Sequence, residues 1–202
     1  MTSHATTRTP LRIAVIISSV REGRFAPVVT DWFVSRAETH GGFEIDVIDL
    51  ASVNLPMVLP SRDGAPSPEA AAALEAVSPR LEAADAFVVV TPEYNHSYPA
   101  SLKNVIDWHF TQWQAKPVAF VAYGSVSGGL RAVEHLRHVF AELHAVAIRD
   151  TVSFHGAWIQ FEEDGRPKDP ETVNAAAKTM LDQLTWWAQS LREARERRPY
   201  QA

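Results

Sequence analysis

The stretch from residue 18 to residue 26 has the composition of an anion-binding turn. It follows a short apolar run and carries Ser19, Arg21 and Arg24 just before Pro27, a residue suited to the first turn of a helix. A helix N-terminus offers unpaired backbone N–H groups, and a hydroxyl with two guanidinium groups adds further donors. The glycine patterns of a triphosphate P-loop and of a dinucleotide fold are both missing here, so a single phosphomonoester fits best. A polar turn that merely caps the helix is the alternative.

Two further stretches have the residue types needed to hold a flat ring. Residues 92–99 (PEYNHSYP) follow an apolar run, and their backbone N–H groups and Asn95 could bond ring heteroatoms while Tyr94 and Tyr98 cover apolar surface. Residues 124–129 (GSVSGG) hold three glycines, which permit close backbone approach or positive φ. Each stretch alone is compatible with ordinary turn chemistry. Their combination with the phosphate-type turn indicates one binding site.

Regular elements must bring these turns together, and the sequence alternates between two kinds of segment. Short apolar runs predict buried strands, and longer runs with helical spacing predict helices. The predicted strands are 11–17, 43–50, 86–91, 117–123 and a weaker 146–154, and the predicted helices are 27–40, 68–84, 101–110, 129–144 and 169–197. Residues 51–68 are rich in proline and are predicted to form a long loop.

This alternation predicts an α/β fold, with a doubly wound five-stranded parallel sheet of flavodoxin-like order 2-1-3-4-5 and helices on both faces. Ligands of such sheets bind at the carboxyl ends of the strands, where the turns after strands one, three and four meet. Asp49 ends the second predicted strand, where a Rossmann domain would bind ribose, but without the glycine pattern we assign it no such role.

The length, composition and charge of the chain exclude several classes of function. The 202 residues suit a single domain over 11–198 after a disordered tail at 1–10. The absence of cysteine excludes disulfides, thiolate catalysis and Cys-ligated metals. A net charge of −5 does not favour nucleic-acid binding. No apolar run reaches the roughly 20 residues that span a bilayer, so we expect a cytoplasmic protein. His135 and His138 share one helix without a third ligand, so we expect surface histidines and no metal.

The turn at 92–99 and the segment after it resemble the NADPH-dependent FMN reductase family of the flavodoxin-like superfamily. The sequence of residues 92–108 agrees with the family signature P-E-Y-N-x-S-x-P-x-x-L-K-N-x-I-D-W at every named position. Residues 18–21 resemble the family's G-S-x-R phosphate loop, with Ser18 in place of the usual glycine, and Arg24 stands where some members have serine. Residues 124–129 resemble the glycine-rich loop beside the flavin ring, and the likeness extends over residues 11–154.

The resemblance implies an FMN enzyme with NADPH or NADH as co-substrate. By that resemblance, hydride would pass from the nicotinamide to flavin N5 and a second substrate would then be reduced, so no side chain is assigned as catalytic. The implied FMN-binding residues are Ser19, Arg21, Arg24, Phe25 and Ala26 at the phosphate, Pro92, Glu93, Tyr94, Asn95 and Ser97 beside the ring, and Gly124, Ser125, Ser127, Gly128 and Gly129 at its pyrimidine end.

We therefore expect an FMN-dependent NAD(P)H oxidoreductase that reduces a small acceptor such as a quinone, an azo compound, a metal oxyanion or free flavin. A flavodoxin-like electron carrier without nicotinamide turnover is the alternative, but a carrier needs an acidic docking face and the negative charge here is spread out. A flavin-free regulatory relative is a third possibility.

The sequence also predicts a homodimer or homotetramer. Leu55, Met57, Val58 and Leu59 form an apolar cluster on the long loop, and such a cluster suits the cover of a neighbouring subunit's flavin. The segment 109–113 adds Phe110 and Trp113 to this cover. Trp113 and Trp186 are predicted either at a subunit interface or buried within the monomer.

Overall fold

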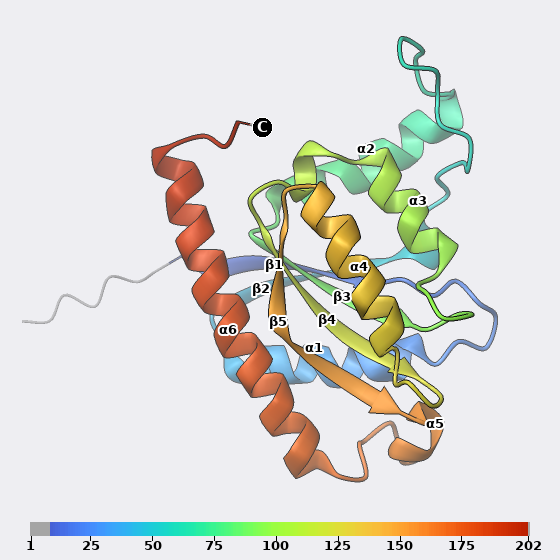
Figure 1. The fold of residues 1–202 in the computed structure, drawn as a ribbon, viewed down its shortest axis with the longest axis vertical. Helices are drawn as coiled ribbons and strands as arrows, with labels where there is room; N and C mark the ends of the chain where they lie inside the picture. The colour runs from blue at the N-terminus through green and yellow to red at the C-terminus, as the bar shows by residue number, and fades with distance from the viewer. Residues whose placement is uncertain (1–8, 202) are drawn as a thin grey trace, which may run out of the picture.

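The computed structural model describes residues 9–201, so most of the predicted N-terminal tail lies outside the described residues. Five parallel strands form one sheet in the order β2-β1-β3-β4-β5, which confirms the predicted topology (Figure 1). The strands are β1 (Leu11–Ile17), β2 (Phe43–Asp49), β3 (Ala86–Pro92), β4 (Pro117–Gly124) and β5 (Val146–His155).

Helices cover the sheet on both faces, because its central strands are apolar on both sides (Figure 1). The helices are α1 (Ala26–His40), α2 (Pro68–Ala83), α3 (Ala100–Trp108), α4 (Leu130–Glu142), α5 (Ala157–Gln160) and α6 (Pro170–Arg197), with the 3₁₀ turns η1 (Leu50–Ser52) and η2 (Thr111–Trp113). One core cluster joins α1 and α6 to the sheet, and the other joins α2, α3 and α4 to its opposite face.

The boundaries differ from the predicted ones by a few residues, and three short elements, η1, η2 and α5, were not predicted. The short helix α5 follows β5 directly, after Gly156 adopts a left-handed φ of +59°. Trp113 is fully buried between Phe87 and Phe140, so its place is the core of the monomer. Trp186 on α6 is 62% exposed.

The parallel topology brings the turns of interest to one edge. Residues 18–25, 93–99 and 125–129 follow the carboxyl ends of β1, β3 and β4, which are neighbours in the sheet (Figure 1). Within residues 9–201, no helix combines the length and the apolar character needed to cross a bilayer.

Candidate functional site

The turn after β1 has an excess of hydrogen-bond donors. The N–H groups of residues 19–23 donate to no acceptor within residues 9–201, and α1 begins without a side-chain cap. Arg21 is exposed, and its side chain forms no hydrogen bond or ion pair with the described residues. The buried hydroxyl of Ser18 is likewise without a hydrogen-bond partner. These donors fit an anion with several acceptor oxygens, as the predicted phosphate group has.

Arg24 has a different environment from Arg21. Its guanidinium forms a two-pronged ion pair with Asp49 at the end of β2, with Nη1 2.6 Å from Oδ1 of Asp49, and Nη1 also donates to the Ser19 carbonyl at 2.5 Å. Hydrogen bonding from Arg24 holds the pKa of Asp49 below its usual value. Arg24 thus fixes the phosphate-type turn against β2, and Arg21 is the guanidinium that remains available to a ligand.

The role of Asp49 as the partner of Arg24 was not predicted from the sequence. The position of Asp49 at the end of the second predicted strand indicated this pairing, because Asp49 is in register with Ile17 at the end of β1, and Arg24 follows Ile17 by a few residues. A carboxylate and a guanidinium at adjacent strand ends are placed to form an ion pair.

A phenol connects the turn after β1 to the turn after β3. The Tyr94 hydroxyl lies 2.6 Å from Oγ of Ser19, and Ser19 is fully buried. Tyr123 lies beside this pair, and burial raises the pKa of its phenol, so Tyr123 stays neutral. If Tyr94 donates this hydrogen bond, the hydroxyl hydrogen of Ser19 is free to point elsewhere.

Residues 94–97 form a tight two-residue hairpin. Tyr94 and Ser97 exchange both backbone hydrogen bonds, at 2.8 and 3.1 Å, while Asn95 and His96 adopt positive φ of 48° and 72°. Positive φ at both central positions defines a type I′ turn, which favours asparagine. Asn95 and His96 are therefore presented at the exposed tip, and Ser97 Oγ is held 2.9 Å from Nδ1 of His135 on α4.

Glu93 connects the turn after β3 to the glycine-rich turn. Its almost fully buried carboxylate accepts hydrogen bonds from the Ser127 hydroxyl at 2.5 Å and from the Arg131 backbone and side chain at 3.1 and 3.2 Å. Burial raises the pKa of Glu93, but these hydrogen bonds outweigh it, so the net pKa lies below its ordinary value. The carboxylate also caps the first turn of α4, where negative charge is stabilising.

The glycines after β4 are required by close packing, Gly128 against β5 and Gly129 against β4 itself. Gly128 and Gly129 have φ of +61° and +85°, and a Cβ on Gly128 would lie 2.4 Å from Oγ of Ser153 and 2.6 Å from the His155 ring. Ser153 donates to the Gly128 carbonyl, and Nδ1 of His155 donates to the Val126 carbonyl, each at 2.9 Å. Ser153 and His155 were not predicted, although their i, i+2 spacing places them on one face of a strand.

The second half of the family signature positions the proline-rich loop. The Asn104 amide donates to the Leu55 carbonyl and the Trp108 indole donates to the Pro56 carbonyl, each at 2.8 Å. The next residues, Met57 to Leu59, are exposed. The helix α3 therefore presents this apolar segment to the surroundings.

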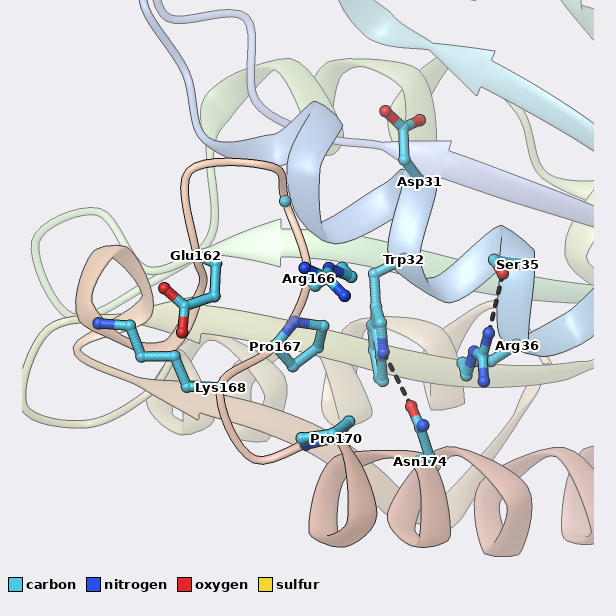
Figure 2. Close-up of a pocket in the computed structure, with 11 residues that line it drawn as sticks. Asp31, Trp32, Ser35, Arg36, Glu162, Arg166, Pro167, Lys168, Pro170 and Asn174 are labelled. Carbon is cyan, nitrogen blue, oxygen red and sulfur yellow. Dashed lines mark hydrogen bonds between the residues drawn. The ribbon is translucent and has the colours of Figure 1, made fainter.

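Two cavities lie near these elements, but only one of them borders any of the three turns. One of about 390 Å³ lies between Val20, the segment 50–57 and the start of α3, next to the phosphate-type turn. Another of about 540 Å³ lies between α1, residues 162–168 and the start of α6, where the Trp32 indole donates to Asn174 (Figure 2). The second cavity has no lining residue from the three turns, so we do not assign the chemistry of the site to it.

All the predicted site residues lie at the carboxyl edge of the sheet, on the three turns or at the strand and helix ends beside them. Phe25 and Ala26 stand at the start of α1, Pro92 ends β3, Gly124 ends β4, and Ser125 accepts a backbone hydrogen bond from Gly156. His135 and His138 are exposed, as predicted.

Comparison with known proteins gives the family. The family model for NADPH-dependent FMN reductase matches residues 11–159. An NAD(P)H-dependent FMN reductase of Schizosaccharomyces pombe is 33% identical over 63% of this chain, and the chain spans only 64% of that relative's length. A probable NADPH:quinone oxidoreductase of Oryza sativa is 31% identical, with 88% of this chain and 89% of the relative covered. The flavoenzyme FerB of Paracoccus denitrificans has the same fold, with a TM-score of 0.69, 24% identity and 89% and 98% of the two chains covered. The chain belongs to the NADPH-dependent FMN reductase family.

Proposed function

We propose that this protein is an FMN-dependent NAD(P)H oxidoreductase that reduces a small-molecule acceptor by two electrons. With a quinone, one NADPH and one proton from solvent give NADP⁺ and the hydroquinone. Bound FMN supplies the redox chemistry. The observation that carries the proposal is the donor-rich turn after β1, which hydrogen bonds connect to the turn after β3 and, through Glu93, to the glycine-rich turn.

The residues of the chain bind and orient the cofactor in this proposal. Arg21 and the N–H groups of residues 19–23 bind the phosphate, while Arg24 holds their turn against Asp49. The hairpin at residues 94–97 and the glycine-rich turn line the ring and offer it backbone groups. Ser18, where the family usually has glycine, adds one more buried hydroxyl beside the phosphate turn.

The names of the relatives favour an enzyme over an electron carrier, since they are reductases of FMN and of quinones. The two functions differ in one measurable property. An enzyme of this kind oxidises NADPH by itself, whereas a carrier accepts electrons only from a partner protein.

The proposal is tested on the purified full-length protein. FMN is added to saturation, excess is removed, and the absorbance spectrum is recorded before and after NADPH is added without oxygen. We expect a yellow protein that NADPH bleaches and a quinone re-oxidises. A yellow protein that NADPH leaves unchanged would indicate a carrier, and a protein that stays colourless with excess FMN would contradict the flavin site.

We further propose a homodimer, or a homotetramer built from dimers, located in the cytoplasm, where reduced nicotinamides are available. The exposed apolar segment 57–59 supports the assembly. Hydrogen bonds from α3 hold the two residues before it, and Met57 lines the same cavity as Val20 of the proposed phosphate turn. Sedimentation at micromolar concentration tests this proposal. A monomer of 22.4 kDa that binds FMN and oxidises NADPH at full rate would contradict it.

A further inference from the structure

Three large apolar side chains are exposed where β4 and β5 end. Val126 on the glycine-rich turn is 84% exposed, and Trp158 and Ile159 on α5 are 61% and 63% exposed. We refer to these three residues as the apolar shelf. Figure 1 shows α5 at the carboxyl end of β5, on the side of the molecule where the turn between β4 and α4 lies.

Hydrogen bonds attach the shelf to the proposed flavin site. The Gly156 N–H donates to the Ser125 carbonyl, and His155 donates to the Val126 carbonyl, both at 2.9 Å. The other end of the glycine-rich turn is bound by Glu93 through Ser127. The shelf is therefore continuous with the turn that lines the proposed ring site.

The exposure of α5 follows from its construction. Gly156 precedes the helix in a left-handed conformation, and the extended backbone of Phe161 ends the helix after one turn. The side-chain amide of Gln160 donates to the His155 carbonyl at 3.1 Å. Ala157 and Phe161 are buried on the core side. The two residues between them that carry large apolar side chains, Trp158 and Ile159, are left facing the surroundings.

The charge and size of the shelf indicate which kind of ligand it can bind. The three shelf side chains are uncharged, and Arg131 beside the glycine-rich turn is paired with Glu93, so the shelf itself is better suited to an apolar group than to an oxyanion. The proposed subunit contact uses the exposed segment 57–59 on another element, so the shelf is left for a smaller ligand. The flat face of an indole is suited instead to an aromatic or alkyl group.

We propose that the apolar shelf binds the apolar part of an uncharged aromatic acceptor, a quinone with an alkyl substituent, and so sets the acceptor preference of the enzyme. This proposal rests on the proposed function, because it places the acceptor beside the proposed flavin. Trp158 acts as a specificity-determining residue and leaves cofactor binding to the three turns.

The test compares Trp158→Ala with Trp186→Ala, a matched control on α6 whose indole is equally exposed at 62% but lies on a different element. Acceptors are a decyl-substituted benzoquinone and ferricyanide, a small hydrophilic anion. We expect Trp158→Ala to lower kcat/KM for the quinone about ten-fold, the loss expected for part of an aromatic contact area. The ferricyanide rate, the FMN affinity and the rate of flavin bleaching by NADPH should not change, and Trp186→Ala should resemble the wild type throughout.

A second measurement does not depend on turnover. Calorimetry measures binding of the dimethyl ether of the matching hydroquinone, which carries the same decyl chain and cannot be reduced. We expect binding to wild type and to Trp186→Ala and a loss of about ten-fold in Trp158→Ala. If the protein fails to oxidise NADPH, this binding result still decides whether the shelf takes an apolar aromatic ligand.

Other outcomes would overturn the proposal. Equal losses for quinone and ferricyanide would show that Trp158 does not select acceptors. Equal binding of the ether by wild type and Trp158→Ala would show that Trp158 makes no apolar contact with the ligand. A shift of Trp158→Ala, but not of Trp186→Ala, toward smaller species in sedimentation would assign the shelf to a second copy of the chain.

Discussion

The two arginines of the phosphate-type turn should respond differently to substitution. The Arg21 side chain forms no hydrogen bond or ion pair with the described residues, so Arg21→Ala should leave the folded protein as stable as before. Its loss should weaken FMN binding by ~1.5–3 kcal/mol, the usual size of a hydrogen bond to a charged group, which corresponds to about 10- to 150-fold in Kd. Riboflavin has no phosphate, so its binding should not change.

Arg24→Ala should lower stability as well as FMN affinity. The substitution removes the partner of Asp49 and the support of the Ser19 carbonyl. Because both side chains of the pair are partly exposed, we expect a loss of about 1–2 kcal/mol in the free energy of unfolding at pH 7. The pair holds the pKa of Asp49 below its ordinary 3.8, so its contribution is present above that value and is lost as the pH falls through the lower, folded pKa.

The assay combines two titrations on each variant. Flavin fluorescence gives Kd for FMN and for riboflavin, and urea unfolding gives stability at pH 7 and at lower pH. Equal losses of FMN and riboflavin affinity in Arg21→Ala would refute the assignment of Arg21 to the phosphate. The two roles would be reversed if Arg21→Ala left FMN affinity unchanged while Arg24→Ala lowered FMN affinity without lowering stability.

Three further substitutions test separate parts of the site and the fold. Glu93→Gln should cost about 1–2 kcal/mol in urea unfolding at pH 7, and the difference should shrink below the ordinary pKa of 4.5; a difference that grows in acid would contradict the bound carboxylate. Gly128→Val should reduce FMN affinity at least about ten-fold, because its Cβ would collide with Ser153, whereas Gly41→Val adds positive-φ strain without a collision and should not. Burial lowers the pKa of Lys116 to about 8, so stability should rise between pH 8 and 10.5, and urea unfolding of Lys116→Met should lack that rise.

The sequence was sufficient for the sheet because its central strands are buried on both faces. Strands β1, β3 and β4 are apolar at nearly every position, and short apolar runs bounded by turn residues are typical of the central strands of a parallel sheet. The helix α5 was missed because a single turn has too few residues to show helical periodicity. Trp113 was left undecided because a lone tryptophan in a connection has no pattern that indicates which surface it meets.

For the site, the sequence located the turns but not their internal partners. The family signature and the glycines mark where the chain meets a ligand, yet Arg24 and Asp49 find each other only because β1 and β2 are adjacent in register. Ser153 and His155 are likewise far in sequence from the Gly128 they support. Pairings of this kind depend on strand order and on side-chain direction, which a single sequence does not state.

Strand order also arranges the proposed chemistry along the edge of the sheet. Hydrogen bonds run from the turn after β1 to Tyr94, from Glu93 to the glycine-rich turn, and from that turn to the end of β5. In the proposed site the phosphate lies over β1, the ring over β3 and β4, and the acceptor over β5, so neighbouring strands hold neighbouring parts of one reaction. Because the Glu93 side chain joins the ring turn to the glycine-rich turn through Ser127, loosening it should disturb the ring and acceptor positions together and leave the phosphate turn, held by Arg24, in place.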